Sequence, residues 1–388
     1  MRVLHLIDAA SPQASPTTLA LLKESSSRFV KTHGHQVLLL GGEELSRQAR
    51  MAGIRGAHHL GVPGGRAYLG WPAIAGHLRR RTDFDVVHCW SIGTLATASL
   101  MMRSTPRVLT ITQTPSARGL RWLRVLAHTV DATVYLTLSN TLRRALLGGG
   151  VPSSAVHVLR PGLDMAQVAH ADRAAVRQNW GIETDDSQVV ALLSDPPHNT
   201  DSLPAALAVC LSADSSLRCP IRPRLLTHPN QRHRRRAQII LSQMSLNNGS
   251  LLDTRIESPW AILPACDVAL TIGPHGGGLS MLWAMAANVP ILGEATYAIS
   301  EIVEDRHSAL LVKPDQPASL AHKLDQLLQD PQLAWRLRDT ARHEAYSFFS
   351  CHRYGQSLQT VYEQLVAGQS IEVPALETTG GLRFSGRG

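Results

Sequence analysis

Three consecutive glycines, Gly276, Gly277 and Gly278, stand between an expected strand at 267–272 and an expected helix at 279–287. Backbone N–H groups and the helix dipole at the start of a helix favour an anion, and glycine allows close approach to the backbone. The turn is therefore a candidate anion site, suited to a phosphate. The alternative is a strand-to-helix turn that binds no ligand.

Basic side chains are the second group of residues that could bind a ligand or a partner. The 388-residue chain has 38 basic and 30 acidic residues, a net charge of +8. Clusters lie at 79–81 and in Arg232, Arg234, Arg235 and Arg236, at the start of an expected helix. The second cluster is interpreted as a membrane-surface patch, with a solvated helix face as the alternative. We expect no nucleic-acid partner, because few aromatic residues interleave with the arginines and no binding motif is present.

Other site chemistries are not favoured. The five cysteines are scattered without CxxC spacing, and the 18 histidines show no HExxH or paired-ligand pattern. We therefore expect neither a disulfide framework nor a bound metal, and no other cofactor. Apolar runs stop well short of the roughly 20 residues that a membrane span needs, and the N-terminus is typical of a first strand. A cytoplasmic protein is expected.

The elements that position these residues alternate between strand and helix. Expected strands at 2–7, 36–40, 85–88, 107–112 and 133–136 precede a second series at 189–193, 224–227, 267–272, 289–292 and 309–312. Strands separated by helices predict parallel βαβ units and an α/β fold with doubly wound sheets. We expect a domain at 1–165, a second at 166–345, a C-terminal helix within 346–366 that packs back towards the first domain, and a flexible tail at 367–388.

Several segments together resemble a known family. They are LPACDVAL (263–270), PHGGGL (274–279), LWAMAANVPIL (282–292), SEIV (300–303) and ALLVKPD (309–315), with DVVH (85–88) and VLRPGLD (158–164) in the first half. Their order and spacing resemble the retaining glycosyltransferases of family 4, over roughly residues 1–345. The resemblance implies the GT-B fold, in which two Rossmann-like domains face each other across a cleft. It also implies transfer of a sugar from a nucleotide-sugar to an acceptor bound mainly by the N-terminal domain, with the donor diphosphate over the glycine turn.

The resemblance also implies which residues contact the donor. The family's two glutamates, spaced E-x7-E, fall on His275 and Trp283. His275 can bond a sugar hydroxyl; Trp283 can stack on a ring or simply pack in the core, and core packing is the favoured interpretation. The donor-binding residues that the resemblance implies are His275, Gly276, Gly277, Gly278, Leu279, Trp283, Glu301 and His198.

Two further family positions are replaced. Asp195 stands where the family has the arginine of its phosphate clamp, and His198 or a neighbour takes the place of the lysine. Gln113 stands near the usual place of a histidine beside the donor sugar; it cannot act as an acid or base near neutral pH. No catalytic residue is assigned. His88, at the end of its strand, is either a locally hydrogen-bonded structural histidine or a site residue.

The function that these observations predict is a retaining, hexosyltransferase-type glycosyltransferase. Its acceptor is expected to be a glycan or a lipid-linked molecule, and peripheral contact with the inner membrane face is expected through the arginines at 232–236. The alternative is a catalytically silent GT-B protein that binds a sugar or a partner. The replaced positions favour this alternative, whereas the order of the family segments favours the enzyme.

Overall fold

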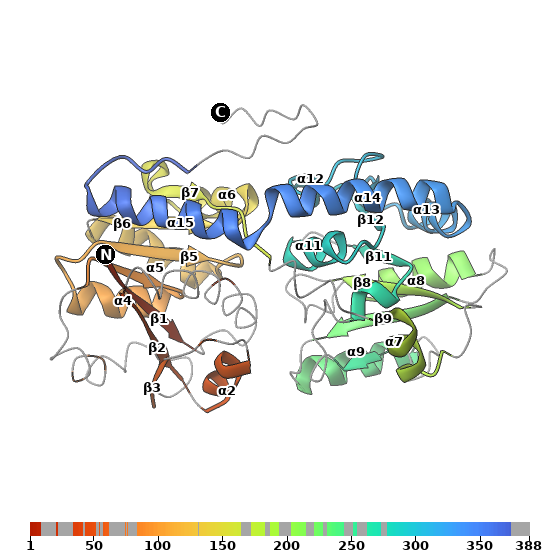
Figure 1. Ribbon diagram of the computed structural model, residues 1–388, viewed down its shortest axis with the longest axis horizontal. Coiled ribbons are helices and arrows are strands. Elements are labelled where there is room, and N and C mark those ends of the chain that lie inside the picture. The colour runs from red at the N-terminus through yellow and green to blue at the C-terminus, as the bar shows by residue number, and fades with distance from the viewer. Residues whose placement is uncertain are drawn as a thin grey trace. The chain divides into compact units, whose positions relative to one another are not determined.

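The chain folds into two compact α/β units, Met1–Gly162 with Cys351–Leu376, and Leu163–Ser350 (Figure 1). They are called unit 1 and unit 2 below. The structure is a computed structural model. It describes residues 1–8, 21, 34–41, 43–51, 54, 57–61, 74, 76, 84–130, 132–163, 172–182, 187–193, 203–214, 221–227, 231–243, 251–253, 262–272 and 278–373.

Unit 1 contains a seven-stranded parallel sheet in the order β3-β2-β1-β4-β5-β6-β7. Its strands are β1 (Arg2–Asp8), β2 (Gly34–Leu40), β3 (His58–Leu60), β4 (Val86–Cys89), β5 (Arg107–Ile111), β6 (Thr133–Thr137) and β7 (Val156–Val158). Its helices are α2 (Glu43–Met51), α4 (Ile92–Met101), α5 (Ala117–Thr129), α6 (Asn140–Gly148), the short η2 (Ser153–Ala155) and α15 (Cys351–Val366).

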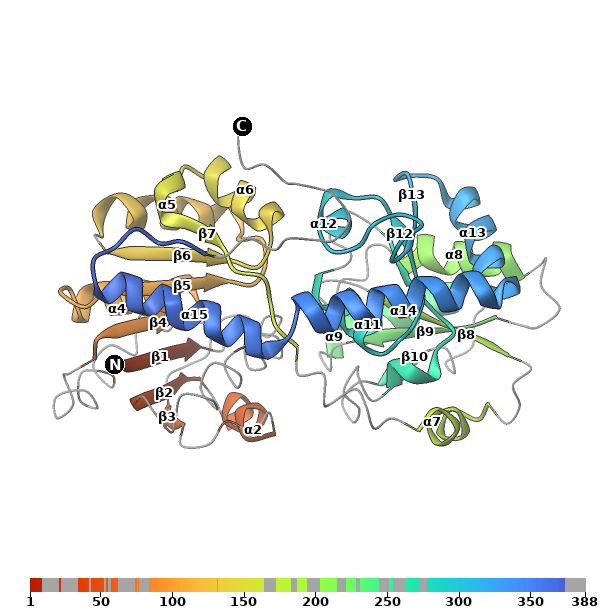
Figure 2. The same cartoon turned by 45° about the horizontal axis from the view of Figure 1, so that its top comes forward.

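Helices cover both faces of this sheet. Leu4, Leu6 and Leu109 point to one face, where they pack against Leu123 of α5 and Leu146 of α6. The other face receives α15, whose buried residues recur at helical spacing; Figure 2 shows this helix lying across the strands. The buried residues of α15 are Tyr354, Gly355, Leu358, Val361 and Tyr362.

Local signals in the sequence set the helix ends. The Ser139 hydroxyl accepts a hydrogen bond from Leu142 N at 3.1 Å, which confirms the expected N-cap of α6. The helix ends at Gly148, and Gly150 adopts a φ of +86° that other residues rarely adopt. In unit 2, Asn288 takes the left-handed conformation (φ 59°) just after α11.

Unit 2 contains a six-stranded parallel sheet in the order β10-β9-β8-β11-β12-β13. Its strands are β8 (Gln188–Leu193), β9 (Ile221–Thr227), β10 (Leu251–Asp253), β11 (Val268–Thr271), β12 (Ile291–Glu294) and β13 (Leu310–Val312). Its helices are α7 (Arg173–Asn179), α8 (Leu203–Asp214), α9 (Gln231–Gln243), the short η5 (Leu263–Ala265), α11 (Gly278–Ala286), α12 (Tyr297–Ser300), α13 (Pro317–Gln329) and α14 (Pro331–Phe348).

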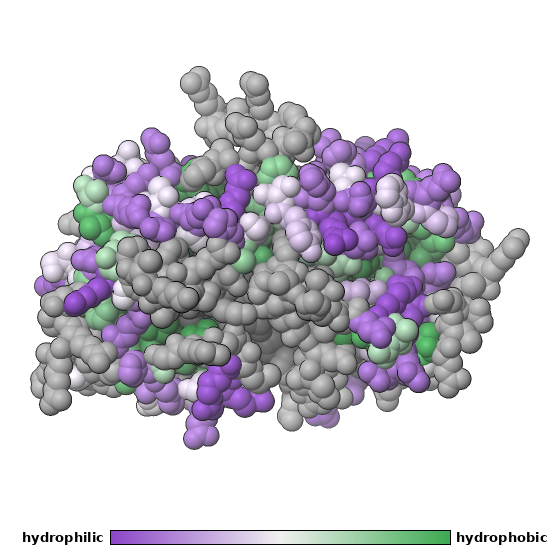
Figure 3. Space-filling model, in the orientation of Figure 1, coloured by the Kyte–Doolittle hydropathy of each residue, from purple (hydrophilic) through white to green (hydrophobic). Residues whose placement is uncertain are grey.

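The core of unit 2 lies between the sheet and helices α8, α9 and α13. It joins Val190 and Leu270 of the central strands to Leu207 of α8, Leu241 of α9 and Leu324 of α13. Helix α14, which packs against α11, presents a largely hydrophilic outer surface in Figure 3. Each sheet thus has the doubly wound parallel architecture that the alternation of strands and helices predicts. The tail expected at 367–388 lies outside the described residues from 374 onward.

Candidate functional site

The strand order of unit 2 defines one sheet edge as the place for a ligand. The order reverses between β8 and β11, which pair in parallel with Thr271 opposite Leu193. In open α/β sheets, ligands bind beyond the carboxyl ends of the strands at this switch point. The segments that leave the two strands here are 194–200 and 273–277. They contain Asp195, His198, His275, Gly276 and Gly277, which all lie outside the described residues.

Helix α11 begins at Gly278, directly after the glycine turn. Its first backbone N–H groups therefore belong to the same carboxyl edge of the sheet. The side chain of Leu279 is not among those described. The helix is buried on every side from Met281 to Ala286, and Trp283 is only 8% exposed. A helix apolar all round belongs in a core, so the indole of Trp283 is surrounded by protein.

Thr271, the last residue of β11, carries a buried hydroxyl. Its side chain is fully buried, and Oγ1 has no hydrogen-bond partner within the described part of the chain. On the neighbouring strand, Gly293 makes room for it, since a Cβ there would lie 2.6 Å from Thr271 Cγ2. An unsatisfied buried hydroxyl is unfavourable in a folded protein. Thr271 is therefore a residue of this edge that sequence analysis missed.

Two buried carboxylates lie at and after the carboxyl end of the neighbouring strand, β12. Glu294, the last residue of β12, is 6% exposed, and its Oε1 accepts a hydrogen bond from Asp315 N at 3.2 Å. Glu301 is 7% exposed at the end of α12, a helix capped at its start by Thr296. Glu301 is a candidate from the sequence, whereas Glu294 is not. The only local signal for Glu294 is that an acidic residue ends an apolar strand. Carboxylate oxygens are natural acceptors for sugar hydroxyls.

The ion pairs around Asp267 belong to the opposite edge of the same sheet. Arg173 and Arg177 each donate to this carboxylate at 2.6 Å, and Val189 N donates at 2.7 Å. Asp267 immediately precedes β11, so the cluster lies at the amino end of the strand, away from the glycine turn. These two arginines join α7 to the sheet and are not placed to hold a ligand at the carboxyl edge.

In unit 1, a buried polar cluster surrounds His88 of β4. One ring nitrogen, Nε2, is hydrogen-bonded to Thr110 Oγ1 at 2.7 Å, and the other, Nδ1, to Tyr362 Oη at 2.5 Å. The ring also stacks on Trp90, with centroids 4.4 Å apart. Trp90 Nε1 donates to His5 Nδ1 at 3.3 Å. The cluster links β1, β4 and β5 to α15; of the five residues, only His88 is a candidate from the sequence, and Tyr362 is the one that comes from the other end of the chain.

These histidines are neutral core residues. His5 and His88 are both fully buried. Burial lowers the pKa of His88 to about 3, and the pKa of His5 falls well below its ordinary value for the same reason, with nearby His35 adding to the effect. A ring whose two nitrogens are both hydrogen-bonded inside the protein is not available as an acid or base. The geometry favours the structural interpretation of His88.

The remaining predicted residues lie on the surface or at strand ends. Gln113 follows β5 at the carboxyl edge of the unit 1 sheet and is half-buried. Arg235 and Arg236 are exposed on α9, while the side chains of Arg232 and Arg234 are not among those described. No helix within the described ranges is both long and apolar enough to span a bilayer.

Two parallel doubly wound sheets in one chain, with a glycine-rich sequence leading into α11 at the switch point of the second, are typical of the GT-B class of glycosyltransferase-like proteins. The model of the family described as "Glycosyltransferase Family 4" matches residues 24–167, and that described as "Glycosyl transferases group 1" matches residues 256–344. The chain belongs to family 4 of the glycosyltransferases and has the GT-B fold, which confirms the resemblance read from the sequence.

Individual relatives are distant. A D-inositol 3-phosphate glycosyltransferase of Streptomyces bingchenggensis is 26% identical over 216 residues, which is 51% of this chain and 46% of the relative; the match thus spans about half the length of that protein. The structure is similar to that of Anabaena HepE in complex with UDP and glucose, at 19% identity and a TM-score of 0.77, covering 95% of this chain and 100% of HepE. It is also similar to a putative UDP-N-acetylglucosamine 2-epimerase from Listeria monocytogenes, at 12% identity and a TM-score of 0.64, covering 97% and 99%.

Proposed function

We propose that this chain is a glycosyltransferase that moves a sugar from a nucleotide-sugar to a glycan or lipid-linked acceptor, with retention of anomeric configuration. The observation that carries the proposal is the place of Gly276–Gly278. The turn lies at the switch point of the unit 2 sheet, directly before α11, and inside the stretch that the group 1 family model matches. An N-terminus of a helix at a switch point suits a diphosphate.

In this proposal, unit 2 binds the donor and unit 1 binds the acceptor. Backbone N–H groups at 276–279 would face the diphosphate, and Glu301 and His275 would accept or donate hydrogen bonds to donor hydroxyls. HepE, a structural neighbour, has been crystallised with UDP-glucose, which supports a nucleotide-sugar as the ligand class. No protein nucleophile is assigned, because stabilisation of the leaving diphosphate is the main task of such a site.

Calorimetry with UDP, GDP and their sugars tests donor binding. Gly277→Asp should lower the affinity for the bound nucleotide at least tenfold, because it places a carboxylate beside the phosphates. Gly61→Asp is the matched control; Gly61 is exposed in unit 1 and has open space around it. Equal affinities for the two variants would show that the nucleotide site lies elsewhere in the chain. Absence of binding at millimolar nucleotide concentration would overturn the enzyme proposal.

A second function is favoured by one observation. Trp283 is buried, and the resemblance assigns the second family glutamate to this position, so core packing there would replace a donor contact. A catalytically silent protein would bind the nucleotide-sugar yet neither transfer nor hydrolyse the sugar. The two functions differ in the release of nucleoside diphosphate from the bound donor. Release that continues in EDTA would support a transferase that needs no metal, as expected from the sequence.

A further inference from the structure

One segment of the chain is rich in arginine and almost free of acidic residues. Between residues 92 and 163 there are eight arginines, no lysine and a single acidic residue, Asp131. This segment therefore carries a net charge of +7 (histidines neutral), whereas residues 1–91 carry +5 and residues 164–388 carry −4. Its arginines are Arg103, Arg107, Arg118, Arg121, Arg124, Arg143, Arg144 and Arg160.

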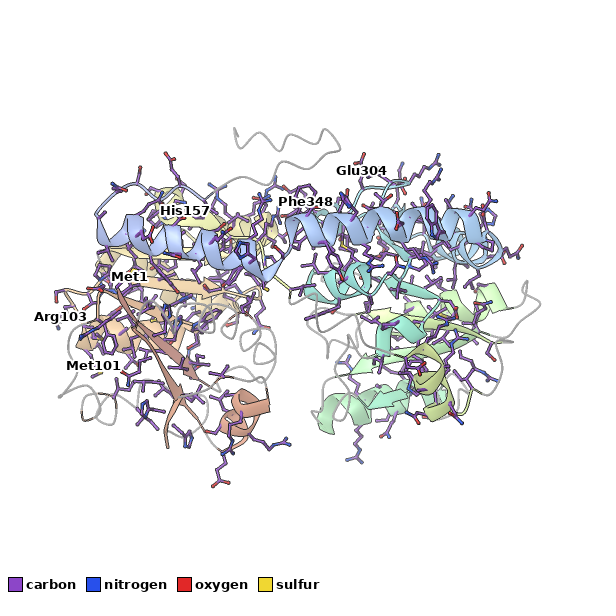
Figure 4. All side chains as sticks on the ribbon, in the orientation of Figure 1. Met1, Met101, Arg103, His157, Glu304 and Phe348 are labelled. Carbon is purple, nitrogen blue, oxygen red and sulfur yellow. The ribbon has the colours of Figure 1, made fainter. Side chains whose placement is uncertain are left out.

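Five of these arginines are exposed on one helical layer. Helices α4, α5 and α6 share one face of the unit 1 sheet. A Cβ at Gly119 of α5 would lie 3.1 Å from Ile92 of α4, and a Cβ at Gly149, the C-cap of α6, would lie 3.0 Å from Leu120 of α5, so the three helices are neighbours. None of the three contains an aspartate or a glutamate. The exposed arginines are Arg103, which follows α4 (Figure 4), Arg118, Arg121 and Arg124 on α5, and Arg144 on α6.

Apolar side chains are exposed on the same layer. Trp122 is 52% exposed and Val125 is 49% exposed on α5, and Leu100 is 67% exposed at the end of α4. Arg118, Arg121, Trp122 and Val125 recur at i, i+3, i+4 and i+7, which places them on one face of the helix. The opposite face of α5 carries the buried Leu123 and Leu126. The outer face of α5 is thus both cationic and apolar.

We propose that this surface, the α4–α6 layer, docks the protein onto an anionic lipid bilayer. Arginines bind lipid phosphates, and each basic residue near an anionic surface adds to the affinity. Tryptophan sits well at the headgroup level, with valine and leucine reaching the acyl boundary. Binding to phosphates alone, as in a nucleic acid, gives no role to Val125 and Leu100. The proposal does not rest on the proposed enzymatic function, and it places the membrane contact in unit 1 rather than on α9.

Sedimentation with vesicles tests the proposal. The full chain is mixed with vesicles of phosphatidylcholine, with and without 30% phosphatidylglycerol. Wild-type protein should sediment only with the anionic vesicles, and less at high salt. Arg118→Gln with Arg121→Gln should lower the partition coefficient about 30-fold, as expected for two arginines near an anionic surface. Trp122→Ser should lower it at low and high salt alike. Arg235→Gln with Arg236→Gln on α9 is the matched control and should sediment like wild type.

Four results would overturn the proposal. Three concern vesicles: wild-type protein that stays in solution with anionic vesicles, α5 variants that sediment like wild type, and loss of sedimentation in the α9 variant alone. The fourth is tight binding to a single-stranded oligonucleotide, insensitive to Trp122→Ser, with no vesicle binding; it would assign the layer to nucleic acid. Thermal unfolding of each variant checks that the fold is kept, which is expected because Arg118, Arg121 and Trp122 are exposed.

Discussion

At the scale of single residues, polar groups are buried in both units, for different reasons. His88 satisfies both ring nitrogens inside unit 1, through Thr110 and Tyr362. Thr271 in unit 2 has a buried hydroxyl without a partner in the described ranges. A satisfied network stabilises and specifies a core, whereas an unsatisfied hydroxyl indicates a position kept for another purpose. The first belongs to the fold, and we assign the second to the ligand edge.

The buried histidines predict how stability depends on pH. The pKa of His88 is about 3 in the folded chain against an ordinary value of 6.5, and the pKa of His5 is also lowered by burial. The unfolded chain therefore binds more protons below pH 6.5. Stability is fully present above pH 6.5 and is lost as the pH falls towards 3, by about 1.4 kcal/mol per pH unit for each histidine. Glu344, whose pKa is raised by burial, acts in the opposite direction.

Urea unfolding between pH 5 and pH 7 measures this dependence. The free energy of unfolding should fall steadily below pH 6.5. His322→Gln, a change at an exposed histidine of α13, should leave the slope unchanged. A free energy of unfolding that is constant over this range would contradict the assignment of His5 and His88 as neutral core residues.

Thr271→Val separates folding from ligand binding. Valine keeps the shape of threonine and removes the unsatisfied hydroxyl, so the free energy of unfolding should stay the same or rise by about 1 kcal/mol. If the hydroxyl serves the bound nucleotide, the affinity should fall several-fold in the same variant. Urea unfolding and calorimetry on one preparation give both values. A loss of more than 1 kcal/mol of stability would show that the hydroxyl is bonded within the fold.

At the scale of elements, α15 brings residues 351–366 back onto the unit formed by the first part of the chain. The helix packs on the sheet of unit 1, where Tyr362 meets His88 across a separation of 274 residues. Tyr362→Phe removes this hydrogen bond and leaves a buried ring nitrogen unsatisfied, which should cost about 1–3 kcal/mol of unfolding free energy. Tyr346→Phe on α14, at a tyrosine 40% exposed, should change stability by less than about 0.5 kcal/mol. Equal losses in urea unfolding would contradict the role of the bond.

Long apolar runs and regular apolar periods in the sequence made most strands and helices predictable. The central strands are apolar runs buried on both faces, and α15 occupies Cys351–Val366, the range that the apolar period indicates. Three strands were missed: β3, β7 and β10. Each has three residues and lies at the end of its sheet, so it lacks an apolar run long enough to be distinguished from a loop. Only pairing with the neighbouring strand reveals them.

Part of the candidate site could be predicted from the sequence. The glycine-rich segment is a candidate anion site because glycine and a helix start are local features. Tyr362, Glu294 and Thr271 were missed because their importance depends on burial and on distant partners. The same limit applies to Trp283, whose two interpretations differ only in what surrounds the ring. Spacing along the chain carries no information about that environment.

At the scale of the whole molecule, each unit uses the same sheet architecture for a different purpose. Unit 2 presents a switch point with a glycine turn, suited to a nucleotide. Unit 1 carries five exposed arginines on one helical layer whose helices contain no acidic residue. The exposed arginines of that layer and the glycine-rich segment that is proposed to hold a diphosphate thus belong to different units. We assign the cation-rich surface to docking and the backbone N–H groups of unit 2 to the donor.

The structure of the chain bound to a nucleoside diphosphate is the most direct test of the central claim, that the turn at 276–278 holds the donor. We expect the two phosphates at the first turn of α11, within hydrogen-bond distance of the backbone N–H groups of Gly276–Gly278. A nucleotide held elsewhere, with its phosphates away from α11, would contradict it, as would a turn that stays empty at saturating nucleotide.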